Sequence, residues 1–311
     1  MDVRPILAAL GLLLSTAAHA QTSQPASSPA SPAFQSAEEV LEALERADEG
    51  LRTFTSEVTY ATIPDLGGAM TTRRGRLAFA VEPSPEGGAP RRRFGIHFES
   101  RWVGTRLIDG PEAKQTIAFD GNWLVEKNYA NQTIERREIV PAGRTVDPFE
   151  LGDGPFPPLP IGQKREVILA RYAVRLVPVH DGLEPDPDLD PQDPDDAALL
   201  TMANRLKAFT SGCTQIVLTP RGGEGDGRFS QIRLWYRPGP DGRLLPNLSR
   251  TIDTHSRNVS IVMLYHPLEI NGPAAEELLS IEPPEGWPVR VYPLEEAATT
   301  GTTSTTPRGA P

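Results

Sequence analysis

The sequence has little cysteine and little positive charge, and each shortage excludes a class of protein. Cys213 is the only cysteine in 311 residues, so no disulfide can form within the chain and the hydrophobic core must supply its stability. We expect Cys213 to be a small buried residue rather than a reactive thiol. Lys and Arg number 31 against 41 Asp and Glu, for a formal net charge of −10. This balance argues against a nucleic-acid binder that depends on a basic patch.

The acidity is concentrated in one segment. Residues 181–196 hold eight acidic side chains and no basic one, so the remainder of the chain sums to about −2. This pattern predicts a solvated acidic insertion in a nearly neutral domain. The segment includes Asp186-x-Asp188-x-Asp190, which begins like a calcium loop, but proline stands where that loop needs glycine and its twelfth residue is Ala197 instead of glutamate. We expect no metal site there.

Long apolar runs are also scarce. The one pronounced run, residues 6–14, follows the short start Met1-Asp-Val-Arg-Pro5 and leads into small residues that end at Ala20. This arrangement predicts a cleaved signal peptide over residues 1–20. Its apolar core is shorter than the ~20 residues that span a bilayer, and no cysteine follows Ala20 to carry a lipid anchor. We therefore expect an exported, soluble, periplasmic protein.

Motifs of the common enzyme classes are missing as well. H-E-x-x-H, G-x-S-x-G, G-x-G-x-x-G and the phosphate loop are all absent, and the four histidines after residue 20 show no metal-ligand spacing. A hydrolase with an unrecognised site stays an alternative, because catalytic carboxylates can meet in space without any fixed sequence spacing. We predict a protein that is not an enzyme and holds no cofactor.

What is present is one domain between two low-complexity ends. Ser, Pro, Ala and Thr dominate residues 21–35 and 294–311, which predicts a disordered linker and a disordered tail. The domain then covers residues 36–293. Ser36 with Glu39 three residues later is a capping-box pattern, and it predicts that an amphipathic helix opens the domain.

Most of the domain follows the period-two pattern of β-strands. Leu77 and Phe79 belong to such a run, and Asp120-Gly121 predicts a hairpin turn between two others. A second amphipathic helix is expected over residues 195–210. Eight to eleven strands with few helices predict a mainly β fold, a strongly bent antiparallel sheet or an open barrel. Its interior is either filled by side chains, as is usual in small barrels, or hollow and able to bind hydrophobic ligands.

The order of short motifs resembles the LolA-type outer-membrane lipoprotein carriers and their LolA/LolB-like relatives over residues 37–291. Asp120-Gly121-Asn-Trp-Leu124 matches the family's "DG-x-x-L" hairpin, and residues 281–289 match its terminal "F-x-P-P-x-G-x-x-V" segment. Four more pieces match in the same order: Gly50-Leu-Arg-Thr-Phe54, Gly75-Arg-Leu-Ala-Phe79, Asp147-Pro-Phe149 and Gln215-Ile-Val-Leu-Thr-Pro220.

The resemblance implies an unclosed antiparallel half-barrel with an N-terminal amphipathic helix and further helices over its concave face. In such proteins a hydrophobic cavity holds the acyl chains of lipoproteins. A monomeric carrier, in effect a chaperone, accepts them from an inner-membrane lipoprotein-releasing transporter and passes them to an outer-membrane acceptor. The alternative roles are an envelope sensor or assembly module with the same fold, and a transporter of free lipids.

By the same resemblance, apolar residues at alternating strand positions are candidates for the lipid-binding cavity. They are Leu77, Phe79, Phe94, Ile96, Phe98, Ile117, Phe119, Ile216, Leu218, Ile232, Leu234, Ile261 and Met263. Candidates for a lid come from the second helix and are Leu199, Met202, Leu206 and Phe209. Packing of that helix on the outer sheet surface would use the same four residues.

One position departs from the family pattern. The carriers place an arginine just before the proline that follows the second strand, where it latches a covering loop; here Glu82 precedes Pro83. Residues 91–93 are three consecutive arginines nearby. They either replace the latch or form a solvated strand end.

Overall fold

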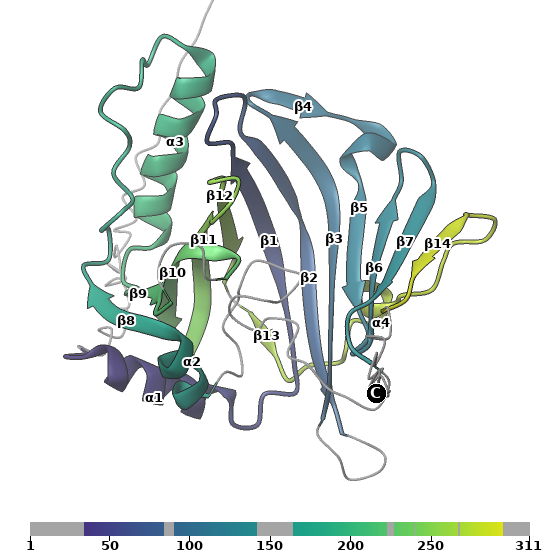
Figure 1. Ribbon diagram of the computed structural model, residues 1–311, viewed down its shortest axis with the longest axis horizontal. Coiled ribbons are helices and arrows are strands. Elements are labelled where there is room, and N and C mark those ends of the chain that lie inside the picture. Colours follow the sequence, from purple (N-terminus) through teal and green to yellow (C-terminus); the bar gives the residue numbers. More distant parts are fainter. Residues whose placement is uncertain are drawn as a thin grey trace, which may run out of the picture. The chain divides into compact units, whose positions relative to one another are not determined.

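The computed structural model describes residues 34–83, 90–141, 164–222, 227–239, 241–266 and 268–294 (Figure 1). These residues lie within one compact unit, residues 31–311. None of their helices is long and apolar enough to cross a membrane. The predicted signal peptide, nearly all of the predicted linker and tail, and the motif at residues 147–149 fall outside the described residues.

In this part of the chain, fourteen strands form one sheet. They are β1 (Thr53–Ile63), β2 (Thr71–Glu82), β3 (Arg91–Val103), β4 (Arg106–Ile108), β5 (Gln115–Phe119), β6 (Trp123–Asn128), β7 (Thr133–Glu138), β8 (Tyr172–Val177), β9 (Thr214–Pro220), β10 (Phe229–Pro238), β11 (Leu244–Asp253), β12 (Val259–Leu264), β13 (Glu269–Ile270) and β14 (Val289–Tyr292). Their order is β14-β7-β6-β5-β3-β2-β1-β12-β11-β10-β9-β8, with β4 beside β3 and β13 beside β1. The sheet therefore has two free edges and does not close.

The expected mainly β, unclosed half-barrel is confirmed, with two corrections. The sheet is mixed rather than antiparallel, because β14 runs parallel to β7. Its strands number fourteen in the described residues, more than the expected eight to eleven. Strand β1 was not among the expected strands, since threonines fill half of its outward positions and Ser56 interrupts its apolar ones.

Four α-helices accompany the sheet in the described residues. They are α1 (Ala37–Asp48), α2 (Arg165–Arg171), α3 (Pro194–Phe209) and α4 (Glu276–Leu279), and a 3₁₀ turn occupies Gly110–Ala113. The predicted helix start at Ser36 is confirmed, because its Oγ accepts a hydrogen bond from the Glu39 backbone N–H at 3.2 Å. Asp193 caps α3 in the same way, accepting from the backbone N–H groups of Asp195 and Asp196.

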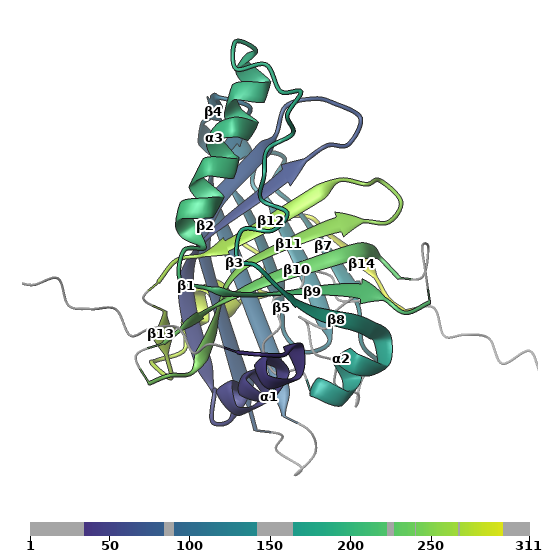
Figure 2. The same cartoon turned by 90° about the vertical axis from the view of Figure 1, so that its left-hand side faces the viewer.

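Different helices cover the two faces of the sheet. The face covered by α1 and α2 over β8–β11 is called the inner face, and the face that carries α3 and α4 is called the outer face. Figure 2 shows α1 beside α2, with α3 well apart from both. Because side chains alternate along a strand, each strand residue belongs to one face or the other.

A β-bulge near the end of β3 breaks this alternation. A one-residue register shift against β2 leaves Glu99 as the extra residue, so Arg101 shares the inner face with Phe98. Strict alternation would have put Arg101 on the outer face. Gly75 lies opposite Phe98 beside the bulge, and a Cβ on Gly75 would be 1.9 Å from the carbonyl oxygen of His97. The bulge therefore requires glycine at this position.

Candidate functional site

Seven of the thirteen candidate cavity residues form one apolar stripe across the inner face. They lie on β2, β3 and β5, and all of them except Phe98 are paired with another member across the strands: Leu77, Phe79, Phe94, Ile96, Phe98, Ile117 and Phe119. All except the half-buried Ile117 are at most 2% exposed. Their rings are in contact, with 6.0 Å between the centroids of Phe94 and Phe119 and 5.4 Å between those of Phe79 and Phe54 of β1. The result is a buried, largely aromatic layer on the inner face.

Four further candidates form a second apolar cluster under α1 and α2. Strands β9 and β10 supply them, and α1 and α2 supply the side chains that pack on them. The strand residues are Ile216, Leu218, Ile232 and Leu234, and the helix residues are Val40, Leu41, Leu44 and Ile168. The two clusters use the same face of the sheet, because Leu234 is opposite Ser249 of β11, and Ser249 is opposite Val262 of the first cluster.

Buried hydroxyl groups separate the two clusters. Ser249 and Thr251 on β11 are 1% and 0% exposed, and their hydroxyl oxygens have no hydrogen-bond partner among the described residues. The same is true of the Tyr236 hydroxyl, whose pKa is raised by burial and by Asp48. A buried hydroxyl without a partner costs about 1–3 kcal/mol. Such groups are rare in a purely structural core, so the inner face has a feature that packing alone does not explain.

Contacts between α1 and α2 close the inner face over the second cluster. The backbone N–H of Arg165 donates to the Glu45 carboxylate at 2.7 Å, and the Arg165 guanidinium donates to Glu42 at 2.8 Å. A cavity of about 20 Å³ lies between α1 and the sheet, beside Leu44 and Phe54. That volume holds about one water molecule, so this end of the inner face is packed shut.

The two remaining cavity candidates point the other way. Ile261 and Met263 lie on the outer face of β12, where they pack with Trp235 and Leu248, while Val262 between them faces inward. The structure therefore separates these two residues from the other eleven. Both faces of β12 are apolar, so its sequence alone could not identify the inward set.

The four lid candidates also lie on the outer face. Met202 and Leu206 are buried against Ile261 and Met263, and Leu199 and Phe209 are half-buried beside them. Clefts of about 760 Å³ and 350 Å³ flank α3, and Met202 lines both. This placement agrees with packing on the outer sheet surface, the second of the two arrangements considered above.

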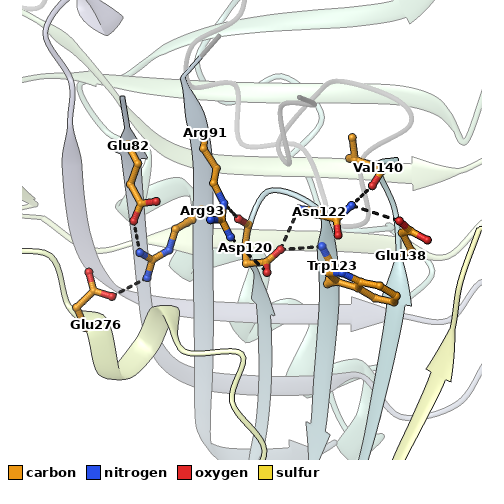
Figure 3. Close-up of polar contacts among 9 residues, drawn as sticks. All are labelled: Glu82, Arg91, Arg93, Asp120, Asn122, Trp123, Glu138, Val140 and Glu276. Carbon is orange, nitrogen blue, oxygen red and sulfur yellow. Dashed lines mark hydrogen bonds and ion pairs between the residues drawn. The ribbon is translucent and has the colours of Figure 1, made fainter. Parts of the chain in front are cut away.

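The arginines at the start of β3 form ion pairs at the rim of the outer face (Figure 3). Arg93 bridges Glu82 and Glu276 of α4, the latter at 2.6 Å. Burial alone would lower the pKa of Arg93, but the hydrogen bonds to Glu276 and Glu82 outweigh it and raise that pKa. Arg91 pairs with Asp120 at 3.3 Å. Arg93 thus joins the sheet to α4, with Glu82 as its second partner, and neither Arg91 nor Arg93 latches anything on the inner face.

Asp120 also holds the hairpin turn that the sequence predicted. Its Oδ1 accepts hydrogen bonds from the backbone N–H groups of Asn122 at 2.9 Å and Trp123 at 2.8 Å. The Asn122 amide in turn donates to the carbonyl oxygen of Val140 and to Glu138 (Figure 3). The "DG-x-x-L" residues therefore serve turn geometry and not chemistry.

The described residues contain no group of three or more His, Cys, Asp or Glu side chains that could hold a metal ion. Cys213 is buried, and burial raises its thiol pKa to about 11, so the thiol is protonated and unreactive at neutral pH. Burial lowers the pKa of His97, whose ring stacks on Tyr129 at 5.8 Å between centroids. None of these groups forms a catalytic arrangement with a neighbour in this part of the chain.

Comparisons with known proteins were made by sequence and by structure. No family model and no curated protein matches the chain. Similar solved structures include an uncharacterized conserved protein from Thermus thermophilus (10% identity, 82% of this chain and 98% of that one, TM-score 0.40). They also include the LolA superfamily protein NE2245 from Nitrosomonas europaea (12%, 79% and 99%, 0.30) and a putative outer membrane lipoprotein-sorting protein domain from Vibrio parahaemolyticus (9%, 77% and 94%, 0.35). At TM-scores below 0.5 this likeness assigns no function, and the site is defined by the residues of this chain.

Two groups of inner-face residues were missing from the sequence candidates. Phe54 and Val58 of β1 and Leu264 of β12 belong to the apolar stripe. The alternation of Phe54, Val58 and Tyr60 was the available signal for β1. Arg73 and Arg101 also face inward, and for Arg101 no sequence signal existed, because the bulge determines its side.

Proposed function

We propose that this chain is a periplasmic carrier that binds the acyl chains of lipoproteins on the inner face of its sheet and shuttles them toward the outer membrane. The observation that carries the proposal is the presence of two apolar clusters, one rich in phenylalanine and one mainly aliphatic, on a single face of an unclosed sheet. The protein acts by binding, without catalysis and without a cofactor. An inner-membrane transporter and an outer-membrane acceptor are its proposed partners.

Burial of an acyl chain against the inner face would contribute a favourable binding free energy. Each buried methylene group contributes about 0.8 kcal/mol, so one long chain supplies ample affinity. The difficulty for a carrier is release rather than binding. The part of the protein that controls closure must therefore be held weakly enough to move.

The α1–α2 pair has the properties that such a cover needs. In the described residues, polar contacts of Arg165 with Glu42 and Glu45 connect α2 to α1. In the ion pair, the side chains of Glu42 and Arg165 are 50% and 38% exposed. An exposed ion pair contributes about 0–1 kcal/mol. Apolar packing of Val40, Leu41 and Leu44 supplies the remaining closure, and acyl chains could replace that packing as α1 moves outward.

The proposal can be tested with a fluorescent reporter on the inner face. All four tryptophans lie elsewhere: Trp102, Trp123 and Trp235 are on outer-face positions, and Trp287 packs against Tyr129. We expect a lipopeptide with brominated acyl chains to quench a Phe79→Trp variant strongly, and to quench the wild type little. Val291→Trp, at a position 54% exposed on β14, is the matched control for the added tryptophan. Equal quenching of the control and the inner-face variant would contradict the proposal.

Native mass spectrometry of the protein purified gently from an envelope fraction separates the related roles. Co-purified acylated peptides or whole lipoproteins support the carrier. Free phospholipid alone moves the function to lipid transport, and a stable complex with one envelope protein moves it to sensing. An empty protein that also refuses acylated peptide would remove the proposed function and leave the fold unchanged.

A further inference from the structure

Two arginines lie next to each other at one end of the apolar stripe. Arg73 of β2 is opposite Arg101 of β3 in the sheet register, and both side chains are half-buried on the inner face. The bulge at Glu99 is what brings Arg101 to this side. Like charges directly opposite each other on a sheet are destabilising, so packing of the empty protein gives no reason for this pair.

Neither guanidinium has a carboxylate partner in the described part of the chain. The Arg101 Nε is buried and has no hydrogen-bond acceptor there, and the Cζ of Arg73 lies 6.0 Å from the ring centroid of Phe98. Glu126 is the acidic group that acts on Arg73, and the Gln115 amide occupies its carboxylate at 2.5 Å. Burial, and after it the neighbouring Arg101, lower the pKa of Arg73. The pair therefore carries two positive charges without a direct ion pair in the described residues, and the buried Arg101 Nε is an unused donor.

Apolar surface begins directly beside the pair. Phe98 is 1% exposed and contacts Arg73, and Tyr60 lies against Phe98 with 6.3 Å between ring centroids. From Arg73 the inner-face positions of β2 continue through Leu77 to Phe79, six residues or about 20 Å along the strand. A ligand that lies along this strand would place an anionic end at the arginines and a long apolar part on the stripe.

We infer that Arg73 and Arg101 bind the phosphate of an anionic lipid whose acyl chain lies along the aromatic stripe. The inference goes beyond the proposed function, because the acyl anchor of a lipoprotein has no phosphate; it adds a second ligand class, phosphate-bearing lipids, for the same face. Two guanidinium groups side by side present forked pairs of N–H donors that match phosphate oxygens. In a half-buried site such charge-assisted hydrogen bonds are stronger than in water. The arginine pair then selects among ligands whose acyl chains the stripe would bind equally well.

The test compares two lipids that differ only in the phosphate. Myristoyl-glycerol-phosphate and uncharged myristoyl-glycerol are titrated into the full chain by calorimetry. The test variant is Arg73→Gln/Arg101→Gln. The control variant is Arg74→Gln/Arg76→Gln, which removes the same charge from two side chains on the outer face of β2. Circular dichroism melting establishes that both variants are folded.

We expect the wild type to prefer the phosphate-bearing lipid, and the test variant to lose about tenfold or more in affinity for it, the range for charge-assisted hydrogen bonds. The affinity of the test variant for myristoyl-glycerol should change less than about twofold. The affinities of the control variant for both lipids should also change less than about twofold. Arg101→Lys keeps the charge and loses the fork, so its affinity should fall between those of the wild type and the test variant.

Four results would overturn the inference. Equal affinity of the wild type for both lipids, or an equal loss of both in the test variant, excludes recognition of the phosphate while leaving acyl binding intact. Binding of glycerol phosphate as tightly as the lipid would make the pair a site for free phosphate. Failure of the wild type to bind either lipid, together with lack of quenching by the brominated lipopeptide, would remove the proposed function itself.

Discussion

The two ends of strand β3 use the same residue type in opposite ways. At its start, Arg91 and Arg93 point to the outer face and are neutralised by Asp120, Glu82 and Glu276. At its end, Arg101 points to the inner face beside Arg73, and no carboxylate in the described residues pairs with either.

The contrast shows that arginine content says little about a surface until the face and the partners are known. The rim arginines tie α4 to the sheet, so their charge serves structure. The inner pair raises the energy of the unliganded protein, which is what a binding site does when its complement is missing. Substitutions along β3 and on neighbouring strands test this difference between the two ends.

The largest expected effect comes from Gly95, at the centre of the outer face of β3. A Cβ there would lie 1.7 Å from the carbonyl oxygen of Leu278, because α4 packs on the small residues Ala78, Ala80 and Gly95. We expect Gly95→Val to displace α4 and lower the free energy of unfolding by about 3 kcal/mol, measured by urea denaturation. Gly272→Val, with nothing within 4 Å of its Cβ position, is the control. An equal loss in both variants would show that α4 is not held by this contact.

Arg93→Gln tests the start of β3, where the arginines form ion pairs. It removes the bridge from Glu82 to Glu276, whose side chains are 38% and 65% exposed. Because the partners are partly solvated, we expect a loss of only about 1 kcal/mol, and the loss should shrink in high salt. The exposed Arg106 of β4 provides the control substitution to glutamine, with an expected change within about 0.5 kcal/mol. Equal effects of the two substitutions would mean that the rim ion pairs do not hold α4 to the sheet.

Much of this architecture followed from the sequence, because the signals were local. The Ser36–Glu39 capping pattern, the Asp120-Gly121 turn and the alternation around Leu77 and Phe79 each appear where they were expected. These features depend on residues at most a few positions apart. The family resemblance grouped Phe94 and Ile96 with Leu77 as inward candidates, and the strand register places the three on one face.

What sequence reasoning missed depends on contacts between distant residues. Both faces of β12 are apolar, so choosing Ile261 and Met263 over Val262 required knowing which helix covers which face. Arg101 lies on the inner face because of a bulge in β3, and the bulge depends on how β3 pairs with β2. Glu82 could be seen as a departure from the family latch, but its pairing with Arg93 depends on strand register and on α4.

Arg73→Gln tests the end of β3, where Arg101 lies opposite Arg73. We expect this substitution to raise the free energy of unfolding, whereas Arg93→Gln lowers it. Removing one of two facing guanidinium groups relieves repulsion, so we expect the unliganded protein to gain about 0.5 kcal/mol of unfolding free energy. The gain should diminish as salt rises. Arg101→Gln should do the same, and the double variant should gain no more than either single one, because the repulsion exists only while both are present. A loss of stability would mean that Arg73 has a stabilising role in the empty protein.

His97 provides the smallest effect and concerns the middle of β3, on the outer face between the two arginine sets. Burial is the main cause of its lowered pKa; Lys114, Lys127 and Arg76 lower it further, and Glu99 opposes them. Above pH 6.5, the ordinary value, the imidazole is neutral in both folded and unfolded chains and adds no pH dependence. As the pH falls below that value the unfolded chain takes up the proton first, so the free energy of unfolding decreases until the folded pKa is passed. His97→Gln should therefore flatten the urea-denaturation profile between about pH 7 and 5 relative to wild type, while His266, whose pKa is also lowered by burial, keeps its own contribution in both proteins. A variant with an unchanged profile would mean that His97 has the same pKa in the folded and unfolded chains, which would contradict its burial on the outer face.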